Sequence, residues 1–379
     1  MRNTVIAGYV RSPFHFATKG ALARVRPDDL AAQVIRGLIE RSKVDPADVE
    51  DIILGCAFPE GEQGLNVARL IGLLAGLPLS VGGMTVNRFC GSSMSAIHIA
   101  MGQIQLGAGE AFICAGVESM SRVPMMGYNP LPNPVLAAKN AGAYMGMGET
   151  AENVATRYQI TRAEQEAFAV ESQRKAGAAQ SDGKLSDEIV PIQTKAGLVS
   201  EDGTLRPDTS AEALAGLKPA FDANGSVTAG TSSPLTDGAS AVLVTSEDYA
   251  RAHGLDILAR IKSVGIAGCA PELMGIGPVG ASTKALERAG INVGDLDVVE
   301  LNEAFASQAL ACMRDLGLKS ETVNIDGGAI AIGHPLGATG ARIVGKAASL
   351  LRREQGKYAL ATQCIGGGQG IATVLEAVA

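Results

Sequence analysis

The sequence predicts an α/β protein that consists of two similar halves with a long irregular region inserted between them. Short apolar runs alternate with segments whose apolar residues recur at helical spacing, which is typical of buried sheets covered by helices. Short motifs from the first part of the chain recur in the same order near its end. The stretch between them is rich in proline, glycine and polar residues, and it interrupts the regular alternation.

The regular elements follow in chain order from the spacing of apolar residues. Acidic residues begin the helix expected at 27–43, where the helix dipole favours negative charge. The helix expected at 91–106 has an apolar face and should be buried on that side. The predicted strands span 4–10, 52–58, 83–87, 111–117, 298–301, 358–363 and 371–375, and the predicted helices span 27–43, 65–74, 91–106 and 303–316.

The internal repeat rests on matched pairs of short motifs. Glu-Arg at 40–41 recurs at 287–288, and Thr-Val-Asn at 85–87 recurs at 322–324. Both copies contain, in the same order, a helix, an acidic turn, a strand, a Thr-Val-Asn strand and a glycine-rich turn. The preserved order indicates a duplication, which would place a site between the two halves.

Three regions are expected along the chain. Within the inserted region, Thr161 and Glu164 form a capping box that predicts the start of a long polar helix. The regions are an N-terminal half at 1–118, completed by about 236–257, an inserted loop domain at 119–245, and a C-terminal half at 258–379.

The composition excludes several classes of protein. The 32 basic and 39 acidic residues give a net charge of −7, which argues against nucleic acid as the main partner. No apolar stretch approaches the ~18 residues of a membrane span, and no targeting segment precedes the first strand. The six cysteines lack paired or metal-ligand spacing, so we expect reduced thiols in a cytoplasmic protein and no metal site.

Cys90 lies between a predicted strand and the first turn of a predicted helix. Free backbone N–H groups and the helix dipole at such a position favour a thiolate and should lower the pKa of the thiol. Cys90 is therefore a candidate nucleophile. A small buried apolar residue is the alternative interpretation.

Two further candidates lie in the C-terminal half. His334 lies in a turn formed by glycine and proline, where an imidazole can act as a base near neutral pH. Cys364 follows a strand and opens a glycine-rich loop. That loop is not a dinucleotide-binding motif, because only nine residues follow Gly370 and no βαβ unit can be completed. The loop is better suited to present backbone amides to an oxyanion.

Asn302 marks the passage from the strand at 298–301 to the helix expected at 303–316. It can be a helix N-cap, or a polar group that orients water or a carbonyl oxygen in the site.

Together these elements resemble the thiolase family over essentially the whole chain. The motifs that carry the resemblance are NRFCGSS around Cys90, NEAF from Asn302, GGAIAIGHPLGATGAR around His334 and CIGGGQG from Cys364. In the inserted region, GETAENVA at 148–155 and VTAGTSSPLTDGA at 227–239 look like the loop domain of the family.

The resemblance implies a thiolase fold, with two duplicated five-layered α/β/α/β/α halves and an inserted lid. It implies that Cys90 forms an acyl-enzyme and that His334, with water bound to Asn302, holds the first oxyanion. Cys364 would protonate the acetyl-CoA carbanion, and the amides of Cys90 and Gly366 would hold the second oxyanion.

The resemblance also implies contacts to coenzyme A, which would be a substrate rather than a permanently bound cofactor. Lys218 and Ser233 correspond to coenzyme A contacts, although the family often has arginine at the first position. Met147, Met274 and Phe305 look like walls of the pocket or, alternatively, ordinary core residues.

The expected activity is thiolytic cleavage of 3-ketoacyl-CoA in fatty-acid or related degradation. Short-chain acetoacetyl-CoA thiolases commonly have a histidine before the lid methionine, whereas this chain has Tyr144-Met145-Gly146-Met147. A biosynthetic acetoacetyl-CoA thiolase and, more remotely, a non-catalytic lipid-binding relative are the alternatives. A decarboxylating ketoacyl synthase is disfavoured, since it would need a histidine at the position of Cys364. By resemblance we expect a homodimer or homotetramer, with a hydratase/dehydrogenase as a possible partner.

Overall fold

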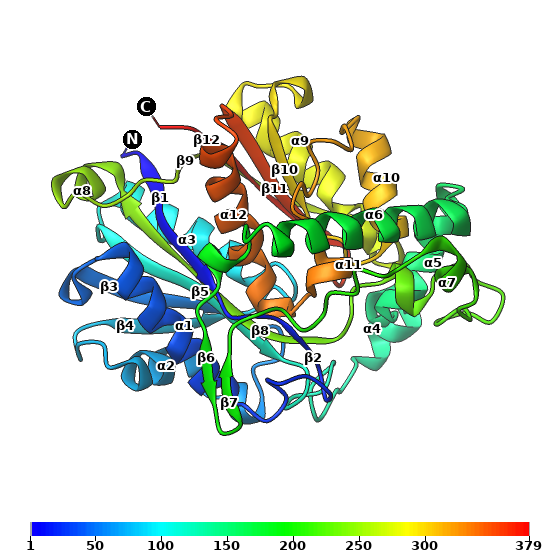
Figure 1. Ribbon diagram of the computed structural model, residues 1–379, viewed down its shortest axis with the longest axis horizontal. Coiled ribbons are helices and arrows are strands. Elements are labelled where there is room, and N and C mark those ends of the chain that lie inside the picture. Colours follow the sequence, from blue (N-terminus) through cyan, green and yellow to red (C-terminus); the bar gives the residue numbers. More distant parts are fainter. Residues whose placement is uncertain (1, 379) are drawn as a thin grey trace.

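The computed structural model describes residues 2–378, in which a mixed ten-stranded sheet forms the centre of the protein (Figure 1). A separate two-stranded sheet pairs β6 (Ile192–Thr194) with β7 (Gly197–Val199). The strands of the large sheet are β1 (Thr4–Arg11), β2 (His15–Phe16), β3 (Val49–Gly55), β4 (Gly82–Val86), β5 (Ala111–Ser119), β8 (Thr236–Ser246), β9 (Ala259–Gly268), β10 (Val298–Leu301), β11 (Tyr358–Ile365) and β12 (Gln369–Glu376).

The helices cover both faces of this sheet and build the inserted region. They are α1 (Pro27–Ser42), α2 (Val67–Ala75), α3 (Ser92–Leu106), α4 (Pro134–Lys139), α5 (Met147–Arg157), α6 (Arg162–Ser181), α7 (Ala211–Ala215), α8 (Glu247–Ala252), α9 (Gly277–Ala289), α10 (Ala306–Leu316), α11 (Ala329–Ile332) and α12 (Leu336–Arg353).

The sheet topology shows the same arrangement twice. Its first half has the order β1-β8-β5-β3-β4, and its second half has the order β9-β12-β11-β10, with β1 and β9 joined antiparallel at the middle. The β3–β5 and β10–β11 pairs are parallel, whereas the other equivalent pairs are antiparallel. This repetition agrees with the duplication indicated by the sequence motifs.

One predicted strand is missing from the second half. The Thr-Val-Asn segment at 322–324 forms only a single parallel bridge, between Val299 and Val323, at the place that β4 occupies in the first half. Turns on both sides of this segment leave no room for a longer ladder. The strand prediction is therefore wrong, although the segment keeps the expected position.

The helices and sheet halves stack in layers. α1 and α2 pack on the outer face of the first half, and α9 and α10 pack on the outer face of the second. Between the halves, α3 and α12 pack against each other in an apolar core that includes Ile97, Val344 and Ile371 (Figure 1). The buried middle layer explains why both helices carry small apolar residues on more than one face.

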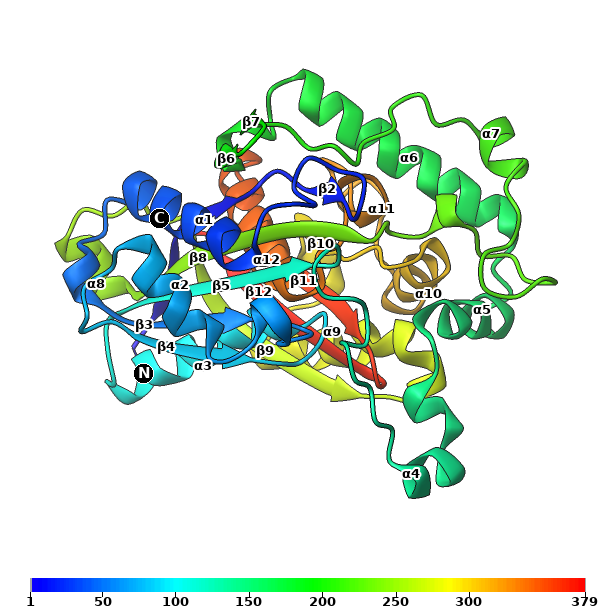
Figure 2. The same cartoon turned by 90° about the horizontal axis from the view of Figure 1, so that it is seen from below.

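The helices of the inserted region lie beside the second half of the sheet, whereas its β6–β7 hairpin packs on α1 of the first half. Figures 1 and 2 show α4 to α7 at one side of the molecule, and α6 packs on α10 and α11. The capping box of Thr161 and Glu164 begins α6, as predicted. β8 starts at Thr236 and pairs with β1 and β5, so this strand belongs to the first half of the sheet. Within residues 2–378, no helix is long and apolar enough to cross a membrane.

A glycine brings the two halves into close contact. A Cβ atom added to Gly116 on β5 would lie 2.1 Å from the carbonyl oxygen of Gly337, at the start of α12. Backbone therefore packs directly on backbone beside the turn that contains His334.

We expect Gly116→Ala to lower the free energy of unfolding by about 1–3 kcal/mol, because neither backbone can move aside without disturbing the sheet. Urea denaturation measures the change. Gly102→Ala is the matched control, since nothing lies within 4 Å of its added Cβ in α3 and alanine is the better helix former. Equal stability of the two variants would contradict the close contact.

Candidate active site

A cavity of about 520 Å³ opens where the two halves and the inserted region meet. Cys90 from the first half and His334 and Cys364 from the second half line it together. The structure thus brings together the three residues that the sequence singled out from distant parts of the chain.

Four of the five predicted substrate contacts also line this cavity. Met147 comes from α5 in the inserted region, and Ser233, Met274 and Phe305 lie on other walls. Lys218 is exposed and is not among the lining residues, so its contact with coenzyme A stays a prediction. The walls are mainly apolar and sulfur-rich, which suits an acyl or pantetheine chain.

Cys90 lies two residues before the start of α3, as expected from the sequence. Burial raises the pKa of its thiol to about 11, although hydrogen bonds from the backbone of Gly366 and of Cys90 itself act in the opposite direction. The expectation of a lowered pKa is therefore wrong for the resting protein. The helix terminus contributes donors, but removal from water has the larger effect.

His334 lies in the turn between α11 and α12 and is buried. Its Nδ1 is 2.6 Å from Oγ1 of Thr339, and that hydroxyl donates to the carbonyl oxygen of Pro335 at 2.9 Å. Because the single hydroxyl proton is already used, Nδ1–H must be the donor to Thr339, and Nε2 carries the free lone pair.

The environment of His334 disfavours the imidazolium form. Burial, followed by the positive charge of Arg342, lowers the pKa of His334 to about 3. The side chain is accordingly neutral near pH 7, with Nε2 available as a base. Together with the raised pKa of Cys90, this means that the resting site holds a neutral thiol and a neutral imidazole rather than an ion pair.

Asn302 is not a helix N-cap. α10 begins at Ala306, four residues later, and Phe305 occupies its N-cap position. The Nδ2 atom of Asn302 lies 3.4 Å from Nε2 of His334, and its Oδ1 atom is buried without a hydrogen-bond partner among the described residues. The amide therefore points toward the imidazole, which agrees with the second of the two interpretations made from the sequence.

Cys364 lies near the end of β11 and is buried. Burial and the neighbouring Cys90 raise the pKa of its thiol well above the ordinary value, so the thiol keeps its proton. The chain then turns sharply through Gly367 and Gly368, whose φ angles are +81° and +82°. This turn allows the Gly366 amide to approach Cys90.

Two buried polar residues that hold these segments were not identified from the sequence. Thr339 fixes the imidazole of His334, as described above. The carboxylate of Glu118 accepts hydrogen bonds from the backbone N–H groups of Ala57 and Gly337, at 2.8 and 2.9 Å. It thereby joins the first half to the start of α12. The only signal in the sequence is an acidic residue at the end of a strand that is otherwise apolar.

Models of two domains of one known protein family match almost the whole chain. Residues 4–248 match the thiolase N-terminal domain, and residues 255–377 match the thiolase C-terminal domain. The chain belongs to the thiolase family. The family predicted from the sequence motifs is thus confirmed.

Individual members of the thiolase family resemble this chain over its full length. A 3-ketoacyl-CoA thiolase of Shewanella sp. (strain MR-4) is 50% identical over 388 residues, which cover 100% of both chains. A 3-ketoacyl-CoA thiolase of Bacillus subtilis (strain 168) is 46% identical over 389 residues, 99% of this chain and 100% of the relative.

Solved structures agree with the predicted fold. Human mitochondrial 3-ketoacyl-CoA thiolase in complex with CoA is 38% identical, has a TM-score of 0.92, and is matched over 100% of this chain and 98% of its own. The thiolase fold is therefore confirmed. In the described part of this thiolase, no group of three or more His, Cys, Asp or Glu side chains is arranged to hold a metal ion.

The raised pKa of Cys90 can be measured through its reaction with iodoacetamide. Because the thiolate is the reactive form, we expect the alkylation rate to rise about tenfold per unit between about pH 7 and pH 9. Mass spectrometry of the peptide that contains Cys90 gives the rate. The peptides with the buried Cys56 and Cys114 serve as internal controls and should remain unlabelled. A plateau below about pH 8 would show a thiolate in the resting protein.

Proposed function

We propose that this protein transfers acyl groups between 3-ketoacyl-CoA and CoA by thiolytic carbon–carbon cleavage. The products are acetyl-CoA and an acyl-CoA shortened by two carbons. The observation that carries the proposal is the convergence of Cys90, His334 and Cys364 on one cavity, with the Gly366 amide directed at the Cys90 sulfur. The relatives named 3-ketoacyl-CoA thiolase support the degradative direction over condensation of two acetyl-CoA molecules.

In the first step, Sγ of Cys90 attacks the 3-keto carbon while its proton moves to Nε2 of His334. Concerted transfer suits two groups that are both neutral at rest, because a charge forms only as the new bond forms. The carbonyl oxygen becomes an oxyanion held by the protonated His334 and by water bound to Asn302, whose Nδ2 atom lies 3.4 Å from Nε2 of His334.

Collapse of the oxyanion breaks the C2–C3 bond. The acyl group stays on Cys90 as a thioester, and the electron pair leaves on C2 of acetyl-CoA. The thiol of Cys364 protonates C2 and becomes a thiolate, which is then neutralised by the proton held on His334. A thiol with a raised pKa suits this step because it is protonated when the carbanion forms.

In the second step the sulfur of CoA is the nucleophile and the sulfur of Cys90 is the leaving group. His334 takes the proton of incoming CoA, whose sulfur attacks the acyl-enzyme, and passes that proton to the departing Cys90 sulfur. The amides of Cys90 and Gly366 hold the oxyanion of this step, since they already point at the same sulfur. Met147, Met274 and Phe305 form the walls around the acyl and pantetheine chains, and Ser233 and Lys218 contact coenzyme A.

Kinetics with 3-ketoacyl-CoA substrates of four carbons and upward test the proposed function. We expect thiolysis with a preference for substrates longer than acetoacetyl-CoA, and at least a 10³-fold loss in Cys90→Ala because the covalent intermediate cannot form. Acetyl-CoA release is measured by chromatography. Cys114→Ala is the matched control, since Cys114 lies in a buried strand and does not line the cavity. Equal turnover of Cys90→Ala and the unmodified chain would refute the covalent route.

We further propose that the protein acts in the cytoplasm as a homodimer or homotetramer and that it joins a hydratase/dehydrogenase partner. The edge strand β4 supports self-association, because exposed strand edges tend to pair and Leu79 just before it is 78% exposed. Leu70, Leu73 and Leu74 on the neighbouring α2 are also exposed.

Light scattering should therefore give twice or four times the chain mass of 38.8 kDa. Leu79→Asp should lower this mass toward that of one chain, because a carboxylate cannot be buried unpaired in an interface. Leu198→Asp, on the 63% exposed Leu198 of β7, is the matched control and should have no effect. A monomeric unmodified chain would contradict the proposed association.

A further inference from the structure

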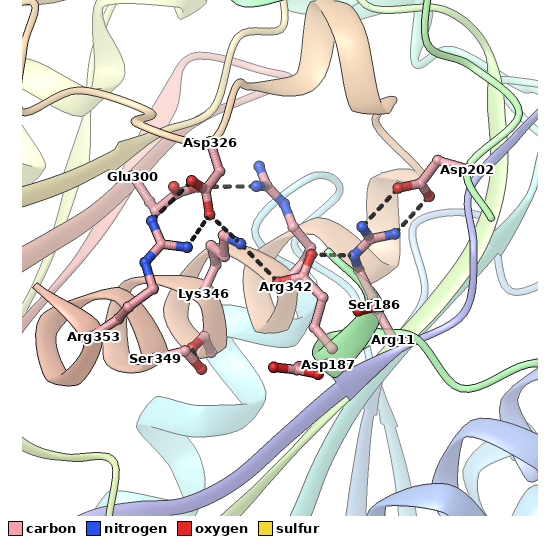
Figure 3. Close-up of polar contacts among 12 residues, drawn as sticks. Arg11, Ser186, Asp187, Asp202, Glu300, Asp326, Arg342, Lys346, Ser349 and Arg353 are labelled. Carbon is pink, nitrogen blue, oxygen red and sulfur yellow. Dashed lines mark hydrogen bonds and ion pairs between the residues drawn. The ribbon is translucent and has the colours of Figure 1, made fainter. Parts of the chain in front are cut away.

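A series of charged side chains, most of them buried, extends from β1 along α12. Figure 3 shows it as a series of ion pairs that begins at Arg11 on β1 and passes along α12. The pairs are Arg11–Glu188, Arg11–Asp202, Lys346–Glu188, Lys346–Asp326, Arg353–Asp326 and Arg342–Glu300, with distances from 2.6 to 3.0 Å. Buried ion pairs add little net stability, because desolvation offsets their attraction. Their presence at this place needs another reason.

The pair of Arg342 and Glu300 connects two segments that carry active-site groups. Arg342 lies on α12, one turn after Thr339, so both side chains project from the same side of the helix. Glu300 lies on β10, two residues before Asn302, which places both on one side of the extended chain. The salt bridge of 2.9 Å between Arg342 Nη1 and Glu300 Oε2 thus ties the segment of His334 to that of Asn302.

This pair is unusually poor in hydrogen bonds. The Nε and Nη2 atoms of Arg342 and the Oε1 atom of Glu300 are buried and have no partner among residues 2–378. A buried arginine with a purely structural role is normally bonded through most of its five donors. Glu300 is therefore the one carboxylate paired with Arg342 among residues 2–378, and His334 is one of the groups on which the charge of Arg342 acts.

We propose that Glu300 and Arg342 are positioning residues for His334: the Glu300 carboxylate, paired with Arg342 at 2.9 Å, offsets the Arg342 charge that acts on the imidazole. This inference rests on the proposed role of His334 as the base. Without the carboxylate, the uncompensated guanidinium would oppose formation of the imidazolium as Cys90 attacks.

The titration of Glu300 gives the proposal a pH dependence. Burial raises the pKa of Glu300 to about 7, while Arg342 and Lys346 on α12 lower it and Asp326 and Glu188 raise it. Below this pH the carboxyl becomes neutral and Arg342 loses its ion-pair partner. The charge of Arg342 also acts on the buried Glu303 and Tyr9, but neither is paired with it, so kcat should fall. The groups that face His334 itself are Arg342 and the uncharged Asn302, Thr339, Cys90 and Cys364, so Arg342 is the charge through which Glu300 acts.

The experiment compares kcat and KM of the full-length protein for a 3-ketoacyl-CoA over about pH 6 to 9. Glu300→Gln keeps the shape and an oxygen for Arg342 but removes the charge. We expect kcat to fall about tenfold with KM within about threefold, and the acidic limb near pH 7 to disappear. Adding Arg342→Met to Glu300→Gln removes the uncompensated charge as well, and we expect most of the lost kcat to return.

A structural role alone predicts the opposite order, with the double variant less active than the single one. Arg353→Gln is the matched control, since it breaks a partly exposed ion pair at the far end of the same series and should leave kcat and its pH profile unchanged. Thermal unfolding of each variant identifies loss of fold. An active unmodified protein with the same pH profile in Glu300→Gln would overturn this inference, whereas an inactive unmodified protein would overturn the proposed function instead.

Discussion

Burial of the reacting groups governs the chemistry of this site. Cys90, His334 and Cys364 are all removed from water, and in each case burial is the largest influence on the pKa. Burial favours the uncharged form of every group, so the two thiols keep their protons and the imidazole carries a proton only on Nδ1. The site therefore begins neutral, and charge separation is confined to the steps in which bonds change. The Thr339 contact of His334, the Gly366 amide at Cys90 and the charge of Arg342 then influence where each proton lies.

The duplicated fold places this cavity between its two halves. One half contributes Cys90 ahead of a buried helix, and the other contributes His334 ahead of the equivalent helix, so the two turns face each other. Close approach of backbones at Gly116 and Gly340 brings α12 within contact of β5 and α3. Side chains larger than hydrogen at these positions would separate the halves and admit water to the reacting groups.

The sequence predicted correctly those features that depend on residues close together in the chain. Alternation of apolar runs predicted the α/β class, ordered motifs predicted the duplication, and Thr161 with Glu164 predicted the start of α6. The prediction of a lowered pKa for Cys90 was wrong. The helix terminus can be recognised in the sequence, but the burial that raises this pKa depends on packing between distant segments. The role of Asn302 stayed undecided between a helix N-cap and a polar group of the site, because the sequence did not show that α10 begins four residues later. Thr339, Glu118 and the Glu300–Arg342 pair act through partners far away in the chain, and no local pattern marks them.

The series of buried charges also explains how the inserted region docks in one arrangement. Glu188 and Asp202 belong to that region, and both are bonded to Arg11 on β1, while Glu188 also meets Lys346 on α12. Apolar surfaces can slide past each other at little cost in free energy, but removing the partner of a buried charge strongly destabilises the protein. Displacing the insertion would leave Arg11 unpaired inside the protein and would remove one of the two carboxylates paired with Lys346. Met147, from the same region, lies against Gly366. Lys346, which binds the insertion through Glu188, lies one turn after Arg342 on α12, so one helix carries both the residue that fixes the insertion and the residue whose charge acts on the base.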